Sequence, residues 1–433
     1  MNLRDKKITD DKYYDSLQIT SDRVVLHSDL NNFFASVEAL YQPSLKNVPM
    51  AICGNEKERH GIILAKNDLA KRYGIKTGET VKSAREKCRE LVTCNSRYPE
   101  YVEYSRAVRS VYLQYTPRVE PFGIDEAWLD VSAYAGRGRG RLFENAEALA
   151  DEIKSKVFKE TGLKVSVGVS FNKAFSKLAS DMKRKNIPTV ISPDNYELII
   201  GKIPARDMIY VGRQTNELLK QNRLFTLSDV ARHKRSYLGE LFGKKGENVW
   251  DFARGYDFSP VSVYTVKEDT KSVSNSRTLP YDVTTVEEGE SVLFSLCESV
   301  IERIRERRMG CRTVRIYIRT CDLSTMTRQS KLEKHTDSLF EVFSEVSRLF
   351  RENAKFSKSI RSLGVALEDL DSMAMFQMNV FDKERDLKRA EIDMMLDKLK
   401  AVYGDKSIFR GSSLMKKELS EFNKKHPAFN HNL

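Results

Sequence analysis

The chain has 433 residues, of which 40% are hydrophobic and 31% are charged, and its formal net charge is +12 with a pI near 9.2. This length predicts about three domains, and the excess of positive charge favours a polyanionic partner, although a basic protein without such a partner has the same composition. Six scattered cysteines without C-x-x-C spacing indicate neither a zinc site nor a disulfide framework, and no apolar run is long enough to span a membrane, so we expect a cytoplasmic protein with no membrane partner.

Hydrophobic periodicity and turn residues divide the chain into six sections. They are an N-terminal extension (1–22), a section that alternates short apolar strands with helices (23–205), short helices separated by glycines (206–257), a polar linker (258–272), a second section of strands and helices (273–370) and a tail with one strong helix (371–433). This succession of elements indicates the α+β class.

Three carboxylates stand at the ends of predicted strands. The short apolar strand 24–29 ends in Asp29, and Asp125 and Glu126 lie side by side just before a strand with apolar alternation. Adjacent acids beside a hydrophobic strand are costly to bury unless a cation neutralises them. Carboxylates at strand edges suit two Mg²⁺ ions, which take oxygen ligands and share them with phosphates. The sequence therefore predicts a metal site built from these acids.

A helix is predicted directly after Asp29. The free backbone N–H groups of its first turn and the helix dipole favour phosphate oxygens. Phe33 and Phe34 are consecutive, so they cannot share one face of the helix, and one of them can pack in the core while the other faces a cleft. The alternative is that both are core aromatics and Asp29 is an ordinary helix cap.

Three separated segments, 29–38, 123–130 and 167–182, closely resemble the motifs of the Y-family translesion DNA polymerases, and among these the DNA polymerase IV (DinB/UmuC) type. The resemblance runs in order over residues 23–370. It implies a right-hand polymerase, with the first strand–helix section as a ferredoxin-like palm and small fingers. The glycine-separated helices would form a helix-hairpin-helix thumb, and the second strand–helix section an α/β little finger.

The resemblance assigns roles to the three acids. Asp29, Asp125 and Glu126 would hold two Mg²⁺ ions, with the backbone carbonyl of Leu30 as a further ligand. One metal would lower the pKa of the primer 3′-hydroxyl, and the other would bind the triphosphate and neutralise the leaving pyrophosphate. Glu126 corresponds to the residue that the family uses as its active-site acid.

The same resemblance assigns nucleotide contacts to the helix that follows. Phe34 matches the steric gate, a ring beneath the sugar that leaves no room for a 2′-hydroxyl and so selects deoxynucleotides. Asn32 and Phe33 would lie along the triphosphate through their backbone amides, with the ring of Phe33 buried.

The chain departs from the family pattern at the triphosphate. Many relatives have a tyrosine where Asp68 stands and an arginine where Lys71 stands. An aspartate cannot donate to a phosphate, and a lysine lacks the bidentate fork of arginine. Lys66 and Arg72 are possible substitutes. Arg184 aligns with a family lysine that faces the triphosphate, although the basic cluster around it could also be a solvated helix end.

The predicted thumb contains two glycine turns that resemble hairpins for phosphate contact. In the first, Gly212 is retained but the second glycine of the family pattern is replaced, and Arg213 would compensate by its charge. The second turn consists of Gly243, Lys244, Lys245 and Gly246. Glycine turns also occur between helices that bind no DNA.

The predicted little finger is strongly basic. Between positions 301 and 321 there are seven arginines and two glutamates, a net charge of 7 − 2 = +5. Arg315 and Arg319 alternate with apolar residues, which indicates a half-buried strand with one basic face. Such a face would bind DNA phosphates without sequence preference. The competing interpretation is a solvated surface strand.

The tail contains a short segment that resembles the peptide by which bacterial proteins bind the sliding clamp. Gln377 would bond at the rim of the clamp pocket, while Met378, Val380 and Phe381 would fill its apolar groove. A terminal amphipathic strand has a similar pattern.

Together these features predict a template-directed, low-fidelity DNA polymerase without proofreading that acts in translesion synthesis and DNA repair. Its partners would be primer–template DNA, dNTPs and a sliding clamp, and the protein would be a monomer. A nucleotidyl cyclase on a palm-like fold and a DNA-binding scaffold that has lost catalysis are the alternatives. The lesions that it bypasses and its regulation are not encoded in any recognisable motif.

Overall fold

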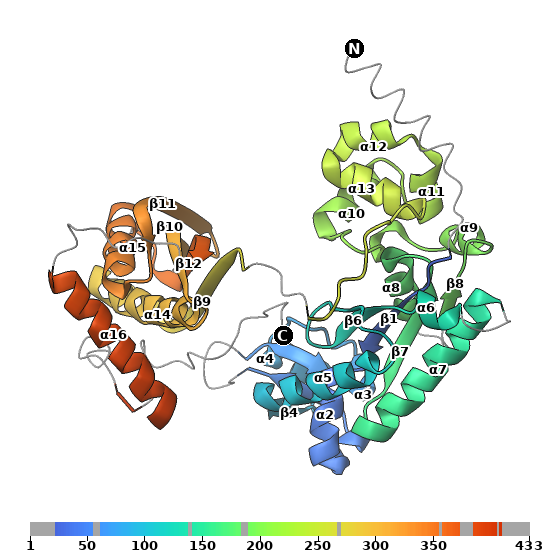
Figure 1. Cartoon of the computed structure of the whole chain (residues 1–433), viewed down its shortest axis with the longest axis horizontal. Coiled ribbons are helices and arrows are strands. Elements are labelled where there is room, and N and C mark those ends of the chain that lie inside the picture. The colour runs from blue at the N-terminus through green and yellow to red at the C-terminus, as the bar shows by residue number, and fades with distance from the viewer. Residues whose placement is uncertain are drawn as a thin grey trace. The chain divides into compact units, whose positions relative to one another are not determined.

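The structure of the chain, a computed structural model, describes residues 22–54, 61–136, 141–182, 189–265, 270–354, 357–372, 384–404 and 407–408. The chain divides into two compact units, one built mainly from residues 1–53 and 63–267 and the other mainly from residues 268–428. The first unit contains a five-stranded and a three-stranded sheet, and the second contains a four-stranded sheet (Figure 1).

The five-stranded sheet forms the centre of the first unit. Its strands are β1 (Val25–Leu30), β5 (Val119–Pro121), β6 (Glu126–Asp130), β7 (Val165–Ser170) and β8 (Thr189–Ile191), in the order β5-β6-β1-β7-β8. β1 pairs antiparallel with both β6 and β7. With α5 (Tyr98–Leu113) and α7 (Leu142–Thr161), the succession is β1-α5-β5-β6-α7-β7. This is the ferredoxin-like topology, so the predicted α+β class and palm are confirmed.

Helices cover both faces of this palm sheet. α5 and α7 pack against one face, where Leu26 and Leu129 lie in the main core. α8 (Lys173–Asp181) packs against the other face over β1 and β7. Gly168 makes that approach possible, because a Cβ atom there would lie 2.1 Å from the carbonyl oxygen of Ser176. Successive side chains of β1 therefore point into different helical layers.

The smaller sheet of the first unit corresponds to the expected fingers. Its strands and neighbouring helices are α2 (Phe33–Tyr41), η1 (Pro43–Asn47), β2 (Met50–Cys53), β3 (Ile63–Lys66), α3 (Asp68–Arg72), α4 (Val81–Lys87) and β4 (Val92–Asn95). β2 pairs antiparallel with β3 and parallel with β4. Asn67 caps α3 by accepting from the N–H of Ala70 at 2.9 Å, and its amide donates to the carbonyl of Val48 at 2.8 Å. These two bonds fix the start of α3 against the chain that follows α2.

Short helices follow β8. They are α9 (Tyr196–Ile200), η2 (Ala205–Asp207), α10 (Arg213–Gln221), α11 (Leu227–Arg232), α12 (Arg235–Phe242) and α13 (Lys244–Ala253). The short helix α6 (Ser132–Ala135) precedes β8 and belongs to the palm. In the view of Figure 1, α10 to α13 form a bundle above the palm sheet. α12 and α13 pack closely at Gly246, where a Cβ atom would lie 2.0 Å from the carbonyl oxygen of Leu238.

The chain beyond the bundle returns to the palm. Val261 is fully buried in a small cluster with Trp128. The N–H of Ser262 donates to Glu120 at 2.9 Å, and the N–H of Tyr264 donates to the carbonyl of Pro117 at 3.0 Å. The first part of the predicted linker is therefore bound along the edge of the palm beside β5.

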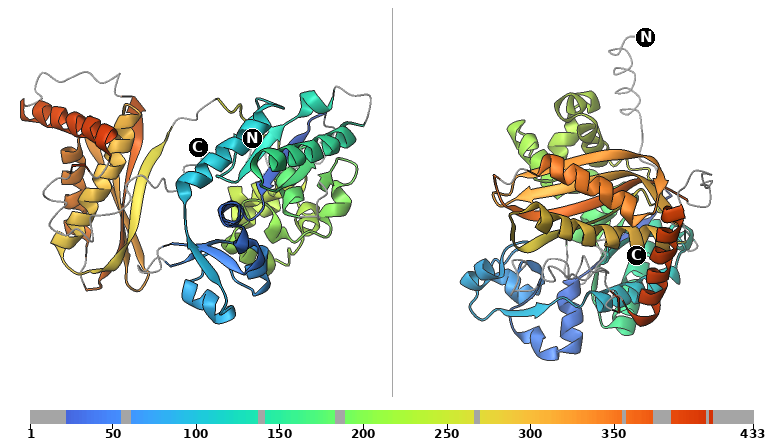
Figure 2. Two further views of the ribbon diagram at one scale, coloured as in Figure 1. Left: turned by 90° about the horizontal axis from the view of Figure 1, so that it is seen from below. Right: turned by 90° about the vertical axis from the view of Figure 1, so that its left-hand side faces the viewer.

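The second unit is built on one antiparallel sheet. Its elements are β9 (Ser272–Val283), α14 (Val286–Glu306), β10 (Met309–Thr320), β11 (Thr325–Thr336), α15 (Leu339–Asn353), β12 (Ile360–Ser372) and α16 (Glu384–Tyr403). The strand order is β11-β10-β12-β9, and α14 and α15 lie on the same face of the sheet (Figure 2). α16 attaches through Arg305, which bonds Asp393 at 3.1 Å and Asp397 at 2.7 Å.

Candidate active site

Strand register brings the three predicted acids to one edge of the palm sheet. In the β1–β6 pair Asp29 lies opposite Glu126. The N–H of Leu30 donates to the carbonyl of Asp125 at 3.0 Å, which joins the end of β1 to the turn before β6. Residues far apart in the sequence are therefore neighbours at the site that the sequence predicts.

Glu126 contacts two basic side chains on the face that α8 covers. Its Oε2 accepts from Lys177 Nζ at 2.5 Å and lies 3.1 Å from His27 Nε2. His27 is fully buried, and its Nδ1 lies 2.7 Å from the hydroxyl of Ser180. A neutral imidazole donates from only one nitrogen, so donation to Glu126 requires the other nitrogen to accept from Ser180. These contacts fix the direction of the Glu126 carboxylate.

Burial and charge act in opposite directions on this group of side chains. Burial lowers the pKa of His27 below its usual value, which keeps the imidazole neutral near pH 7. Burial opposes ionisation of Glu126, but hydrogen bonds from His27 and Lys177 outweigh it and hold the pKa of Glu126 below its usual value. Burial also disfavours the Lys177 ammonium, yet Glu126, Asp181 and Asp29 raise its pKa overall. The edge therefore contains an ionised carboxylate beside a stable cation.

The donor atoms at this edge suit a hard divalent cation. Asp29, Asp125, Glu126 and the carbonyl of Leu30 offer only oxygen ligands, which Mg²⁺ prefers. Within the described ranges, no three acidic, histidine or cysteine side chains stand close enough together to hold a metal ion. Lys177 instead neutralises Glu126 and acts electrostatically on Asp29. Lys177 therefore supplies positive charge to the carboxylates in the place where the sequence predicts the metal ions.

Three polar side chains on one face of α5 contact residues that directly precede the acids. They are Ser105, which donates to the carbonyl of Ile124, Arg109, which donates to the carbonyl of Gly123 at 2.8 Å, and Tyr112, whose hydroxyl lies 2.7 Å from the Ser28 hydroxyl. All three are buried. No motif points to them, and the available signal was a polar stripe at positions i, i+4 and i+7 of a helix with an otherwise apolar buried face.

Phe33 and Phe34 have different surroundings. Phe33 is buried in the palm core, while Phe34 is partly exposed and stacks on Tyr101 with ring centroids 4.2 Å apart. The hydroxyl of Tyr101 donates to Glu38 at 2.7 Å, and Glu38 also accepts from the guanidinium of Arg97. The ring predicted to select the sugar therefore rests on a second ring that is itself bonded to the buried carboxylate of Glu38, the partner of Arg97.

The side chains predicted to bind the triphosphate are partly paired with one another. Lys71 donates to Asp68 at 3.1 Å and also to the side-chain oxygen of Asn32. Asn32 begins α2 in the left-handed region, with φ of 52°. Asp68 cannot donate a hydrogen bond to a phosphate. It also pairs with Lys71, the neighbouring cation that is predicted to bind the triphosphate.

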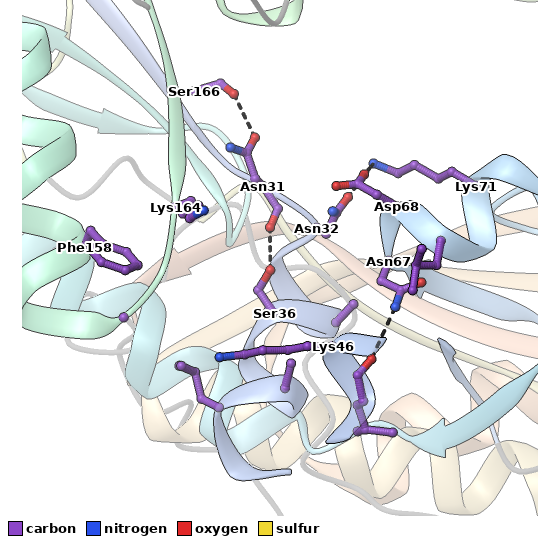
Figure 3. Close-up of a pocket in the computed structure, with 16 residues that line it drawn as sticks. Asn31, Asn32, Ser36, Lys46, Asn67, Asp68, Lys71, Phe158, Lys164 and Ser166 are labelled. Carbon is purple, nitrogen blue, oxygen red and sulfur yellow. Dashed lines mark hydrogen bonds and ion pairs between the residues drawn. The ribbon is translucent and has the colours of Figure 1, made fainter. Parts of the chain in front are cut away.

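Lys66 and Arg72, the possible substitutes for the triphosphate contact, have other surroundings. Lys66 donates to the hydroxyl of Thr77 at 3.0 Å, and Arg72 is exposed at the end of α3. Arg184 lies outside the described residues. A pocket of about 730 Å³ opens beside Asn32 and Lys71, and neither Lys66 nor Arg72 lines it (Figure 3).

The predicted thumb contacts lie at two helix starts. Gly212 and Arg213 are exposed at the beginning of α10. Gly243, Lys244 and Lys245 are exposed at the beginning of α13. The buried Gly246 allows the close packing of α12 and α13 described above, so its position follows from packing whether or not DNA lies nearby.

β10 has the predicted alternation. Val314, Ile316 and Ile318 are buried against the helices. Arg315 and Arg319 are partly exposed on the opposite face, where Arg315 forms an ion pair with Glu368 of β12. On β10 this face therefore carries two cations, one of them already paired.

Some predictions fall outside the described residues. Gln377, Met378, Val380 and Phe381, the proposed clamp-binding segment, lie there. In the ranges that the structure describes, no helix is long and apolar enough to cross a membrane.

Comparison with known proteins places these observations in a family. Residues 28–181 match the impB/mucB/samB family, and residues 270–380 match the C-terminal domain of the same family. A DNA polymerase IV from Acetivibrio thermocellus is 40% identical over 402 residues, which covers 92% of this chain and 99% of the relative. DNA polymerase IV 1 from Bacillus subtilis is 33% identical over 400 residues, which covers 92% of this chain and 94% of the relative.

The fold has a counterpart among solved structures. The Y-family DNA polymerase chimera Dbh-Dpo4(243-245)-Dbh is similar with a TM-score of 0.70 and 22% sequence identity, covering 81% of this chain and 99% of that chain. The likeness supports the right-hand architecture of palm, fingers and little finger.

Proposed function

The chain belongs to the impB/mucB/samB family of Y-family DNA polymerases, and from this premise we propose that Asp29, Asp125 and Glu126 are the catalytic carboxylates of a translesion DNA polymerase. The enzyme is a DNA-directed nucleotidyltransferase that adds dNTPs to a primer. The observation that supports the proposed site most strongly is the register that sets Asp29 opposite Glu126, with Asp125 bonded to the next residue of β1.

The oxygen donors at this edge have the chemistry that two Mg²⁺ ions require. Asp29, Asp125, Glu126 and the carbonyl of Leu30 would hold them. When bound, the ions would lower the pKa of the primer 3′-hydroxyl and neutralise the charge that develops on the leaving pyrophosphate. Lys177 stabilises the ionised form of Glu126. α5 fixes the backbone beside the acids, which limits the reorganisation needed at the moment of reaction.

Selection of the nucleotide would take place at the start of α2. Phe34 would lie beneath the sugar and exclude a 2′-hydroxyl, and its stacking on Tyr101 keeps the ring from moving away. The backbone amides of Asn32 and Phe33, with the ammonium of Lys71, would contact the triphosphate. The pairing of Lys71 with Asp68 predicts weaker attraction for phosphate than a free lysine would provide.

The proposed DNA contacts of the thumb and little finger are basic side chains that are exposed or partly exposed. Arg213, Lys244 and Lys245 would meet DNA phosphates at the helix starts of the thumb, and Arg315 and Arg319 would do so from the little-finger sheet. We further propose that the segment 377–381 binds a sliding clamp, and that the protein acts as a monomer in the cytoplasm.

Primer extension distinguishes this function from its alternatives. A template-directed polymerase extends a primer with dNTPs on intact and damaged templates, a cyclase converts ATP or GTP without a template, and a scaffold binds DNA without either reaction. Extension that follows the template sequence supports the proposal. Cyclisation of ATP or GTP without DNA, or DNA binding with no extension at any Mg²⁺ concentration, would refute it.

A further inference from the structure

The pocket beside Asn32 extends well beyond the point where the triphosphate is expected. It measures about 730 Å³, within the range of roughly 300–1,000 Å³ that small-ligand pockets occupy. α2, η1, α3 and the segment that enters β7 all contribute to its walls (Figure 3). On the α2 side, Ala35 and Ala39 present small side chains, so this wall leaves the space open.

Positive charge lines the pocket. Lys46 belongs to η1, Lys71 to α3, and Lys164 precedes β7 directly, while Asp68 is the one acid among the described lining residues. The net charge of the lining is therefore 3 − 1 = +2. Lys71 is already engaged by Asp68 and Asn32. Lys46 and Lys164 are exposed at the pocket and form no ion pair with any described carboxylate, and the Lys164 ammonium lies 6.0 Å from the ring centroid of Phe158.

Neutral donors add to this charge. The side-chain oxygen of Asn31 accepts from the hydroxyl of Ser166 at 2.7 Å, which leaves the amide N–H groups of Asn31 available to a ligand. The hydroxyl of Ser36 is directed to the backbone carbonyl of Asn31 at 2.7 Å. Ammonium and amide donors with a single competing acid are the groups that bind a chain of phosphates.

We propose that this pocket binds pyrophosphate and longer inorganic polyphosphates, with Lys46 and Lys164 supplying the charge that Asp68 withdraws from Lys71. The proposal rests on the proposed function, because the pocket begins at Asn32 and Lys71, where the triphosphate would lie. It would receive the pyrophosphate as this group leaves the nucleotide. It also assigns the compensation for Asp68 to the opposite wall of the pocket, rather than to Lys66 or Arg72.

The test compares two double variants that each remove two positive charges. Lys46→Ala with Lys164→Ala alters the pocket, and Lys82→Ala with Lys202→Ala removes two exposed lysines that do not line it. Calorimetry measures the affinity of inorganic tripolyphosphate for each full-length protein with Mg²⁺ and primer–template DNA but without dNTP. The pocket variant should bind the probe about 5- to 10-fold more weakly, as expected for the loss of two charged contacts. The control variant should stay within about 2-fold of the wild type.

Two further measurements make the outcome specific. The concentration of pyrophosphate that halves primer extension should rise by the same factor in the pocket variant, and Lys46→Arg with Lys164→Arg should restore it because the charge is retained. Equal tripolyphosphate affinity in the pocket variant and the wild type would overturn the proposal, as would a loss confined to primer–template affinity, which would make the pocket a DNA contact. A wild type that extends no primer would instead refute the proposed function, since the probe affinity is measured without catalysis.

Discussion

The palm sheet and the little-finger sheet are built from the same succession of elements, β-α-β-β-α-β, but they present opposite charges. In the palm, β1 and β6 are central neighbours, so the ends of these strands bring Asp29 and Glu126 together. In the little finger, the central β10 instead displays Arg315 and Arg319 along one face. Strand ends gather a few ligands at one point, which suits chemistry, whereas a sheet face spreads charges over an area, which suits contact with a polymer.

The two regions also differ in how firmly their charges are fixed. Glu126 is held by the buried His27 and by Lys177, and α5 fixes the backbone beside it. Among the described residues, Arg315 pairs with one carboxylate, Glu368, on a partly exposed face. Substitutions should therefore have large effects on rate in the palm, and smaller, graded effects on affinity in the little finger.

The largest expected effect is on catalysis by the palm. Asp125→Ala removes an acid at the metal edge, and the single-turnover rate of primer extension should fall by about 10³-fold or more. Primer–template affinity should remain within about 2-fold, because DNA contacts lie mainly elsewhere. A variant that extends primers at the wild-type rate, or that loses DNA affinity in proportion to its rate, would remove Asp125 from the catalytic site.

The next effect concerns the choice of sugar. Phe34→Ala should lower the preference for dNTP over rNTP by about 10²-fold, since the exclusion of a 2′-hydroxyl depends on the ring. The ratio of kcat/KM values for matched dNTP and rNTP measures it. Phe33→Ala serves as the control, because its ring is buried in the core and its removal should affect stability rather than sugar preference. An unchanged ratio in Phe34→Ala would exclude the steric-gate role.

A smaller effect is expected at the little-finger face. Arg315→Ala with Arg319→Ala should weaken primer–template binding by about 10-fold. The slope of log affinity against log salt concentration should decrease by roughly two, one for each lost phosphate contact. Arg307→Ala with Lys398→Ala removes the same charge from exposed positions off this face and should change affinity by less than about 2-fold. Equal losses in the two double variants would show that only net charge matters and that the sheet face is not a specific contact.

The smallest effect comes from the carboxylate on the same face. Glu368→Gln removes the ion-pair partner of Arg315 and should raise primer–template affinity by about 2- to 3-fold. In the background of Arg315→Ala, the same substitution should have little effect, because the partner is absent. Fluorescence anisotropy of labelled DNA measures both. A gain of equal size in both backgrounds would assign the effect to general repulsion between Glu368 and DNA.

The sequence could predict the acids because strand ends and adjacent carboxylates are local patterns. It could also predict the basic face of β10, since alternation along one strand is visible in the chain. Lys177, His27 and Arg109 could not be assigned in the same way, because their roles depend on which helix packs over which strand. Arg109 and Lys177 reach the site only after α5 and α8 have packed against the palm sheet, and His27 reaches Glu126 only after β1 has paired with β6.

Two further features depend on packing that no single segment reveals. Gly246 reads as part of a DNA-binding turn, yet the closeness of α12 and α13 already requires a glycine there. Val261 lies in a section that reads as a polar linker, yet it is buried against the palm because Trp128 offers an apolar surface. Composition describes the average of such a segment, while burial is decided by individual side chains.

The most direct test of the central claim is a count of bound metal ions. Mn²⁺ can replace Mg²⁺ as a hard cation, and its binding can be followed by electron paramagnetic resonance in a complex with dNTP and a primer that lacks its 3′-hydroxyl. The wild-type complex should bind two Mn²⁺ ions per protein, and Asp125→Ala should lose at least one of them while still binding DNA. Equal Mn²⁺ binding in the wild type and in Asp125→Ala would contradict the assignment of Asp29, Asp125 and Glu126 as a two-metal nucleotidyl-transfer site.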